Sequence, residues 1–131
     1  MGLFGLFGSK NDSEAKEEKQ LPWKVLTSIE QLDGIVADSK TRPVAIFKHS
    51  TRCGISRMVM RQFERSYDID PEKMDLYYLD LLAYRSLSDE VGIKFQILHQ
   101  SPQIIVVKNG VVVAHASHNG IQAHELQNFI S

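Results

Sequence analysis

A single cysteine, Cys53, is present among 131 residues, and this scarcity excludes one class of protein at once. A disulfide joins two thiols, so the chain forms no internal disulfide. It also lacks the even cysteine count of a secreted, disulfide-stapled domain. A thiol without a partner suits the reducing cytosol, and we therefore expect a cytoplasmic protein.

The chain also has no marked excess of either positive or negative charge. The formal net charge is −1, from 15 basic and 16 acidic residues. Nucleic acids and acidic membrane surfaces attract strongly basic proteins. Neither is therefore an expected partner of this chain.

Long hydrophobic runs are lacking as well. The apolar N-terminal stretch MGLFGLFGSK is too short and too rich in glycine to span a bilayer, and it has no basic region of the kind that opens a signal peptide. Leu6 stands where a myristoylation pattern needs Ser or Thr. We expect residues 1–20 to form a flexible tail. The alternative is a weak contact with a partner or a membrane surface through Leu3, Phe4, Leu6 and Phe7.

Regular hydrophobic patterns begin at residue 21 and predict one domain over residues 21–131. The order of its elements is β-α-β-α-β-α-β-β-α. This alternation predicts an α/β fold with a mostly parallel sheet, helices on both faces, and a late hairpin that adds an antiparallel edge strand. We expect strands over 23–26, 43–49, 75–82 and the two arms of 103–116, and helices over 27–40, 53–67, 86–97 and 121–130.

Local signals support several of these elements. Asn109-Gly110 favours a type I′ hairpin turn. The helix over 86–97 is expected to end near Gly92. A capping box is expected at the first helix, and an apolar face is expected on the second. The capping box pairs Thr27 or Ser28 with Glu30 or Gln31, and the apolar face carries Ile55, Met58, Val59 and Phe63 beside Gln62.

Cys53 follows the strand over 43–49 and stands at the start of the next predicted helix. In an open α/β sheet, sites lie at the carboxyl ends of strands, beside helix N-termini. The free amides and the dipole there favour an anion, and the cations of Lys48, Arg52 and Arg57 act in the same direction. An inert cysteine more commonly lies on the apolar face of an element than in a polar segment such as HSTRCG. We therefore predict a reactive thiol.

A second segment, HQSPQIIVVKNG, carries Pro102 directly before a strand. Cis peptide bonds are essentially confined to X-Pro. A proline that opens an interior strand is a place where one can occur, and a trans proline at a strand start is the alternative.

Together these features resemble the thioredoxin fold, a central mixed β-sheet flanked by helices. FKHSTRCGIS and HQSPQIIVVKNG resemble the two signature segments of the YtxJ-like family, the monothiol bacilliredoxins, over roughly residues 21–131. The resemblance implies a thiol-disulfide oxidoreductase that removes bacillithiol from S-bacillithiolated proteins. It implies bacillithiol as co-substrate, no bound cofactor, and S-bacillithiolated proteins and a low-molecular-weight thiol as partners.

The resemblance also implies roles for individual residues. Cys53 is the nucleophile and carries the mixed disulfide. Ser56 occupies the position of a resolving cysteine and hydrogen-bonds the thiolate. Pro102 is cis and packs near the sulfur, and the backbone of Ser101 pairs with substrate. Because the chain has no second cysteine, a free small thiol must attack to regenerate Cys53.

Four residues around the nucleophile are expected to contact the substrate. Gly54 and Ile55 follow Cys53 directly, although the family usually has proline where this chain has Gly54. Arg52 and Arg57 are candidates to bind the malate group of bacillithiol.

Two other functions are weighed against this one. A monothiol glutaredoxin using glutathione or an iron–sulfur cluster carries CGFS where this chain has CGIS. Such proteins also carry a Gly-Cys-Asp-Asp-type segment after the hairpin, whereas residues 116–126 read ASHNGIQAHEL. The other alternative is a thioredoxin-fold sensor or stress protein whose thiol is capped without turnover.

No metal site is expected, because the histidines lack the spacing of a ligand set around the lone cysteine. His49 is interpreted as a packing residue at a strand end, with a role as base as the alternative. The five histidines are His49, His99, His115, His118 and His124.

Overall fold

The computed structural model describes residues 21–130. The expectations of a flexible tail over residues 1–20, and of a contact through its apolar residues, fall outside this described part. None of the helices within residues 21–130 is long and apolar enough to cross a membrane.

Five strands form one mixed sheet in the order β1-β3-β2-β4-β5. β3 pairs in parallel with β1 and with β2, whereas β4 runs antiparallel to both β2 and β5. This architecture confirms the predicted α/β thioredoxin-like fold. The strands are β1 (Trp23–Val25), β2 (Val44–His49), β3 (Asp75–Asp80), β4 (Gln103–Lys108) and β5 (Val111–Ser117). The helices are α2 (Glu30–Asp38), α3 (Gly54–Ser66) and α4 (Arg85–Phe95), followed by the 3-10 helices η1 (His118–Gly120) and η2 (Ala123–Phe129).

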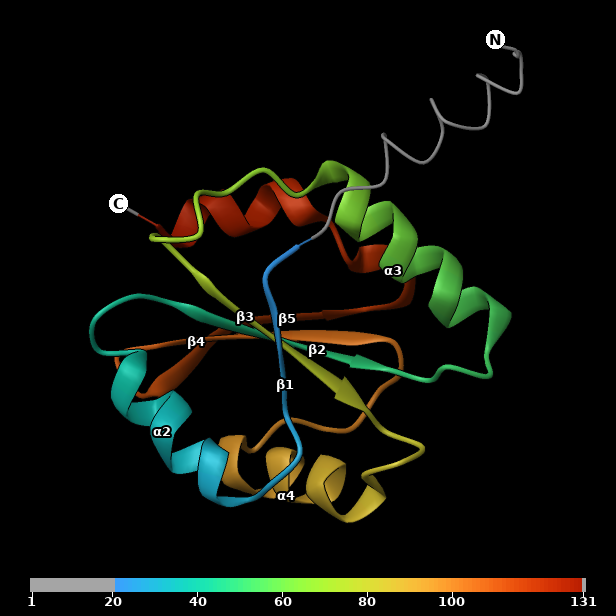
Figure 1. The fold of residues 1–131 in the computed structure, drawn as a ribbon, viewed down its shortest axis with the longest axis horizontal. Helices are drawn as coiled ribbons and strands as arrows, with labels where there is room; N and C mark the ends of the chain where they lie inside the picture. Colours follow the sequence, from blue (N-terminus) through green and yellow to red (C-terminus); the bar gives the residue numbers. More distant parts are fainter. Residues whose placement is uncertain (1–20, 131) are drawn as a thin grey trace, which may run out of the picture.

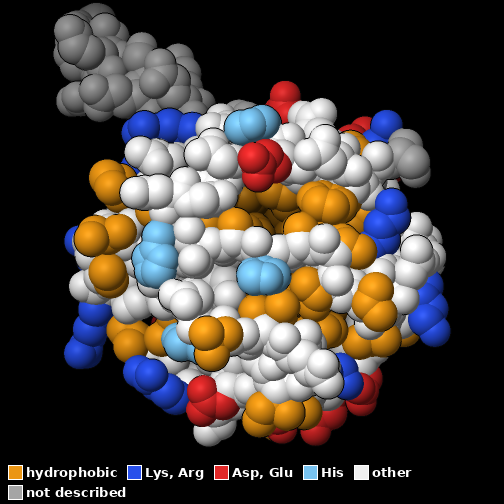
Figure 2. Space-filling view, turned by 180° about the vertical axis from the view of Figure 1, so that it is seen from behind, with side chains coloured by type: hydrophobic (Ala, Val, Ile, Leu, Met, Phe, Trp, Pro, Cys, Tyr) orange, Lys and Arg blue, Asp and Glu red, His pale blue; other side chains and the backbone are white. Residues whose placement is uncertain are grey.

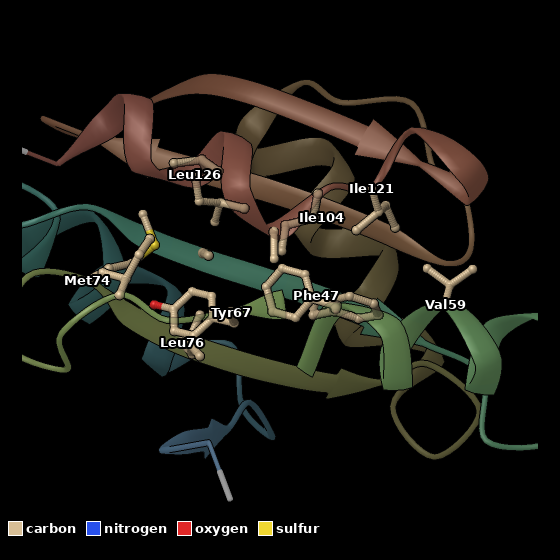
Figure 3. Close-up of a cluster of buried hydrophobic side chains, with 13 residues drawn as sticks. Phe47, Val59, Tyr67, Met74, Leu76, Ile104, Ile121 and Leu126 are labelled. Atoms are coloured by element: carbon tan, nitrogen blue, oxygen red, sulfur yellow. The ribbon is translucent and has the colours of Figure 1, made fainter. Parts of the chain in front are cut away.

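Helices cover both faces of the sheet, with α3 and η2 on one side and α2 and α4 on the other (Figure 1). β2 supplies side chains to both cores, because successive residues of a strand point to opposite faces. The ring of Phe47 lies 5.2 Å from that of Phe63 of α3, centroid to centroid. Both belong to the cluster on that side, in which Figure 3 labels Phe47 and Leu126 of η2. Ile46 packs on the other side with residues of α2 and α4.

The hairpin adds the expected antiparallel edge strand, which is β5. The sheet is mixed and not mostly parallel, because β4 also runs antiparallel to β2. β4 is an interior strand between β2 and β5, and only β5 lies at the edge. Residues 103–107 of β4 are all buried. An interior position covers both faces and both edges of such a strand, which an edge position does not.

Hydrogen bonds explain how α2 begins, and backbone angles explain how the chain turns between β4 and β5. The side-chain oxygen of Gln31 accepts the backbone N–H groups of Thr27 and Ser28 at 2.7 and 2.9 Å, which is the Gln31 half of the predicted capping box. The other half is wrong, because the N-cap residue of α2 is Ile29 and no side chain caps the helix from that position. Asn109 and Gly110 both have positive φ, at 55° and 83°, as the predicted type I′ turn requires.

The expected end of α4 near Gly92 is wrong. The helix continues to Phe95, and Gln96 adopts the left-handed conformation with φ 56°. The N–H of Ile97 then returns to the carbonyl of Gly92 at 3.0 Å. A Cβ at Gly92 would lie 3.1 Å from the Ile97 oxygen, so this glycine serves the close return of the chain and not the helix end.

Two further helical expectations are corrected. The C-terminal segment forms the 3-10 helix η2 instead of an α-helix, and it buries Ala123 and Leu126. On α3, Val59 and Phe63 are buried, but Ile55 and Met58 are 59% and 49% exposed. In the first turn of α3 it is Ser56, and not Ile55, that is buried against the end of β2.

Candidate active site around Cys53

Cys53 is the N-cap residue of α3, with extended backbone angles of φ −96° and ψ 121°. Its N–H donates to the carbonyl of Ser50 at 3.2 Å, and its own carbonyl accepts the N–H of Arg57 at 3.0 Å. The residue is exposed. The sulfur therefore stands at the unpaired amides of a helix start and is open to a disulfide that approaches from solvent.

Ser56 lies on the inner side of the first turn and is fully buried. Its hydroxyl oxygen lies 2.8 Å from Nδ1 of His49 and accepts the N–H of Ser50 at 3.2 Å. Within residues 21–130, this hydroxyl makes no hydrogen bond to Cys53, so the expected bond to the nucleophile is replaced by one to His49. The reason is orientation, because Ser56 faces the end of β2 and Cys53 faces outward.

His49 is 4% exposed, as the packing interpretation requires, but it also holds Ser56. Burial lowers the pKa of His49 below its ordinary value of 6.5. The carboxylate of Asp80 partly offsets this shift, and the guanidinium of Arg57 reinforces it. His49 is therefore a neutral imidazole at pH 7 in the reduced protein.

Lys48 does not act on Cys53 in the way the sequence suggested. Its side chain is fully buried on the opposite face of β2, where Nζ donates to the carbonyl of Ser88 on α4 at 3.4 Å. Burial lowers the pKa of Lys48 to about 8, with Asp89 acting in the other direction. Its cation belongs to the core beside α4, away from the side on which Ser56 packs.

The Ser101–Pro102 peptide bond is cis, as expected. Lys48 of β2 pairs with Gln103, the first residue of β4. Pro102 therefore lies at the same end of the sheet as the C-terminal end of β2. The side chain of Gln103 fastens the approaching loop. It accepts the N–H of Gln100 at 3.3 Å and donates to the carbonyl of Leu98 at 3.0 Å.

The expected substrate contacts surround the thiol and are accessible. Arg52, Gly54, Ile55 and Arg57 are all exposed. Arg57 also braces the active-site turn, because Nη1 donates to the carbonyl of Thr51 at 3.1 Å. The site is therefore a surface of mixed cationic and apolar character beside the sulfur. That these residues bind substrate stays a prediction.

No three His, Cys, Asp or Glu side chains within residues 21–130 are grouped to hold a metal ion.

Hydrophobic side chains line a hollow between β5 and η2, seen in Figure 2 from the β5 side. Ile104, Ala114 and Leu126 line it, and none of its lining residues belongs to the Cys53 turn or to the Pro102 loop. We therefore assign the thiol chemistry to the exposed surface and not to this hollow.

Sequence reasoning found the thiol and its helix but missed the contacts beneath it. The His49–Ser56 hydrogen bond joins a strand end to a residue seven positions later. A histidine that closes a buried strand, followed by a serine on the inner side of the next helix, is the signal that could have suggested it.

An exposed thiol at a helix N-cap, at the end of the sheet that also carries a cis-proline, fits the class of thioredoxin-fold oxidoreductases. The family model described as "Monothiol bacilliredoxin BrxC" matches residues 24–126. The chain therefore belongs to the monothiol bacilliredoxin family.

Solved structures agree with this fold. One thioredoxin-fold protein of proposed oxidoreductase function is 31% identical, covers 81% of this chain and 91% of its own, and superposes with a TM-score of 0.67. The thioredoxin of Malassezia sympodialis is 22% identical, with 85% and 89% of the two chains covered and a TM-score of 0.62. The thioredoxin of Fasciola hepatica is 20% identical, with 80% and 93% covered and a TM-score of 0.58. The two thioredoxins support the fold alone.

Proposed function

We propose that this protein removes bacillithiol from S-bacillithiolated proteins by thiol–disulfide exchange at Cys53. Membership of the monothiol bacilliredoxin family supports the substrate class. The observation that carries the proposal is the placement of the chain's one thiol. It is exposed at the start of α3, while the position of a resolving cysteine holds the buried hydroxyl of Ser56.

The first step transfers bacillithiol to Cys53. The thiolate attacks the bacillithiol sulfur of the mixed disulfide, and the bond between that sulfur and the target protein breaks. The target leaves as a thiolate and takes a proton, and Cys53 now carries bacillithiol in a disulfide. Arg52 and Arg57 flank the sulfur and supply positive charge for the malate carboxylates.

The second step regenerates the enzyme. Because Ser56 cannot attack as a thiol, a free bacillithiol thiolate attacks the bacillithiol sulfur held by Cys53. Cys53 leaves as a thiolate, and bacillithiol disulfide is released. One disulfide is consumed and one is formed, so the cycle needs no oxidant or reductant beyond bacillithiol itself.

The experiment uses the full chain and an S-bacillithiolated model protein. In single turnover, we expect one target thiol to be released per Cys53, with a mass increase of one bacillithiol on the enzyme. Free bacillithiol should then give multiple turnovers. Cys53→Ser should release no thiol, and its melting curve should match that of the wild type.

Two controls separate this function from its alternatives. A glutathionylated copy of the same target tests the choice of small thiol, and equal rates on both substrates would contradict the specificity for bacillithiol. Capping of Cys53 without turnover in the presence of free bacillithiol would contradict the catalytic role and identify a thiol sensor.

A further inference from the structure

A cleft of about 260 Å³ lies between α3 and the 3-10 helix η1 that follows β5. Ser117, the last residue of β5, pairs with Gln103 at the start of β4. The N–H of His118 in η1 then donates to the carbonyl of Pro102 at 3.1 Å. One wall of the cleft therefore starts at the end of the sheet that carries the cis-proline and the thiol.

The cleft has an apolar floor and a polar rim. Val59 and Ile121, both labelled in Figure 3, are buried and belong to the floor. No Lys, Arg, Asp or Glu side chain of residues 21–130 lines the cleft. The rim consists of exposed polar side chains from α3, from η1 and from the residue before η2, namely Gln62, Ser66, His118, Asn119 and Gln122.

The rim has unused capacity for hydrogen bonds. Within residues 21–130, the side chains of Gln62, Ser66 and Asn119 make no hydrogen bond. Gln122 uses one donor, because its Nε2 donates to the carbonyl of Asn119 at 3.4 Å. An amide side chain can both donate and accept, and so can a hydroxyl group. A ligand rich in hydroxyl groups can therefore pair with this rim without bringing a charge.

These features suit a sugar ring. A pyranose carries hydroxyl groups around its edge and C–H groups on its faces, so it can pair with polar side chains while one face covers an apolar floor. Carboxylates instead pair with cations, and the cations of this surface are Arg52 and Arg57 beside the thiol. Bacillithiol has both parts, because its cysteine is joined to glucosamine and the glucosamine carries malate.

We propose that the cleft between α3 and η1 holds the glucosamine ring of bacillithiol, with Gln62 and Asn119 as specificity-determining residues. The inference rests on the proposed removal of bacillithiol, and it adds the site that distinguishes bacillithiol from cysteine. The malate is attached to the ring carbon next to the one that bears the cysteinyl amide. It can therefore turn back toward Arg52 and Arg57 while the ring lies in the cleft.

The dimensions of the ligand allow this arrangement. Val59 and Gln62 follow Cys53 by six and nine residues, which is about 9 and 13.5 Å along the axis of α3. The Cα–Cβ bonds of a helix tilt toward its N-terminus, so the side chain of Gln62 reaches back toward Cys53.

The ligand spans a similar distance. From the bacillithiol sulfur to the outer hydroxyl groups of the ring there are eight bonds, or roughly 10 Å at about 1.3 Å per bond. The disulfide bond to Cys53 adds about 2 Å. The ring hydroxyl groups can therefore reach the rim while Cys53 carries bacillithiol.

The first test compares two disulfides of one target protein, with the full chain as enzyme. One target carries bacillithiol, and the other carries cysteine, which lacks the sugar and the malate. Gln62→Ala and Asn119→Ala should each lower the ratio of the two rates of thiol release, bacillithiol over cysteine, by about fivefold, the effect of one hydrogen bond between neutral groups. Both variants should melt as the wild type does, because both side chains are exposed.

Gln127→Ala is the matched control, because Gln127 is an exposed glutamine of η2 outside the cleft. It should leave the ratio unchanged. Equal slowing on both targets in Gln62→Ala and Asn119→Ala would indicate a merely structural role for these residues and would overturn the proposal.

The second test measures binding without a thiol, by NMR of the side-chain amide groups in the reduced full chain. The methyl glycoside of N-acetylglucosamine is the probe for the ring, and malate is the probe for the carboxylates. At millimolar concentration, the glycoside should shift the amide signals of Gln62 and Asn119, and malate should not. Signals that move with malate alone, or with neither probe, would contradict a sugar site.

The sugar site and the proposed function fail in different ways. Removal of bacillithiol with a ratio that neither variant changes would overturn the sugar site and leave the function in place. Glycoside shifts at Gln62 and Asn119 without any removal of bacillithiol would overturn the function and leave the sugar-binding cleft.

Discussion

Gly54 is the position at which this chain departs from the proline usual in its family, and the structure predicts what restoring proline would do. Gly54 is the first residue of α3, where proline is favoured because the N–H at that position has no partner within the helix. Cys53 already has the extended backbone that a residue before proline requires. A Cβ at Gly54 would have only the Arg57 Nη2 within reach, at 4.0 Å.

Gly54→Pro should therefore stabilise the protein. Proline reduces the freedom of the unfolded chain at no steric cost in the folded one, which contributes about 0.4–1 kcal/mol at compatible sites. For a domain of this size, the corresponding rise in melting temperature is roughly 2–6 °C. Thermal unfolding followed by circular dichroism measures it. A lower melting temperature would refute the assignment of Gly54 to the first helical position.

The same substitution should have a chemical cost. Proline removes the amide hydrogen directly after Cys53, one of the donors that can stabilise the departing thiolate. Loss of a hydrogen bond of about 1 kcal/mol, with a Brønsted slope of about 0.4–0.5, slows the release of Cys53 from its mixed disulfide roughly twofold. Gly54→Ala keeps the N–H and should leave this step unchanged. An unchanged rate in Gly54→Pro would show that this amide does not act on the sulfur.

Two further predictions concern charge. Lys48 should bind its proton more weakly in the folded protein, where its pKa is about 8, than in the unfolded chain, where it is about 10.4. The unfolded state then binds more protons between these values, so stability should rise from pH 8 toward pH 10. In Lys48→Met, urea unfolding should show no such rise and a higher stability at pH 7, by roughly 2 kcal/mol. A rise that persists in the variant would assign it to another group. Arg52→Gln should slow attack on the bacillithiol disulfide about fivefold more than attack on a mercaptoethanol disulfide, consistent with ~1 kcal/mol from an exposed ion pair. Arg61→Gln is the control, and equal slowing on both disulfides would contradict a contact with malate.

Much of the fold could be predicted because its signals are local. The alternation of elements, the Asn109-Gly110 turn and the capping by Gln31 depend on residues only a few positions apart. The prediction of the end of α4 was wrong because it, too, relied on a local signal. A glycine near a helix end is a local sign of termination, but Gly92 serves a contact with Ile97 after the helix has ended.

The sequence by itself determined that any thiol chemistry of this chain must use Cys53. With one cysteine in the chain, a second step by an internal thiol is excluded, whatever the fold. The sequence also determined that this sulfur begins a helix, because a buried strand and an amphipathic helix meet at Cys53.

The tertiary structure decided which groups lie beneath the sulfur. Lys48 and His49 are neighbours in the sequence, yet the first bonds to α4 and the second to α3. Successive residues of a strand face opposite sides, and only the packing of helices on the sheet determines which partner each side meets. A buried polar group must find a hydrogen-bond partner, and that partner comes from whichever element covers it. The contact between His49 and Ser56 could therefore be recognised only from the structure, in which α3 packs on the sheet.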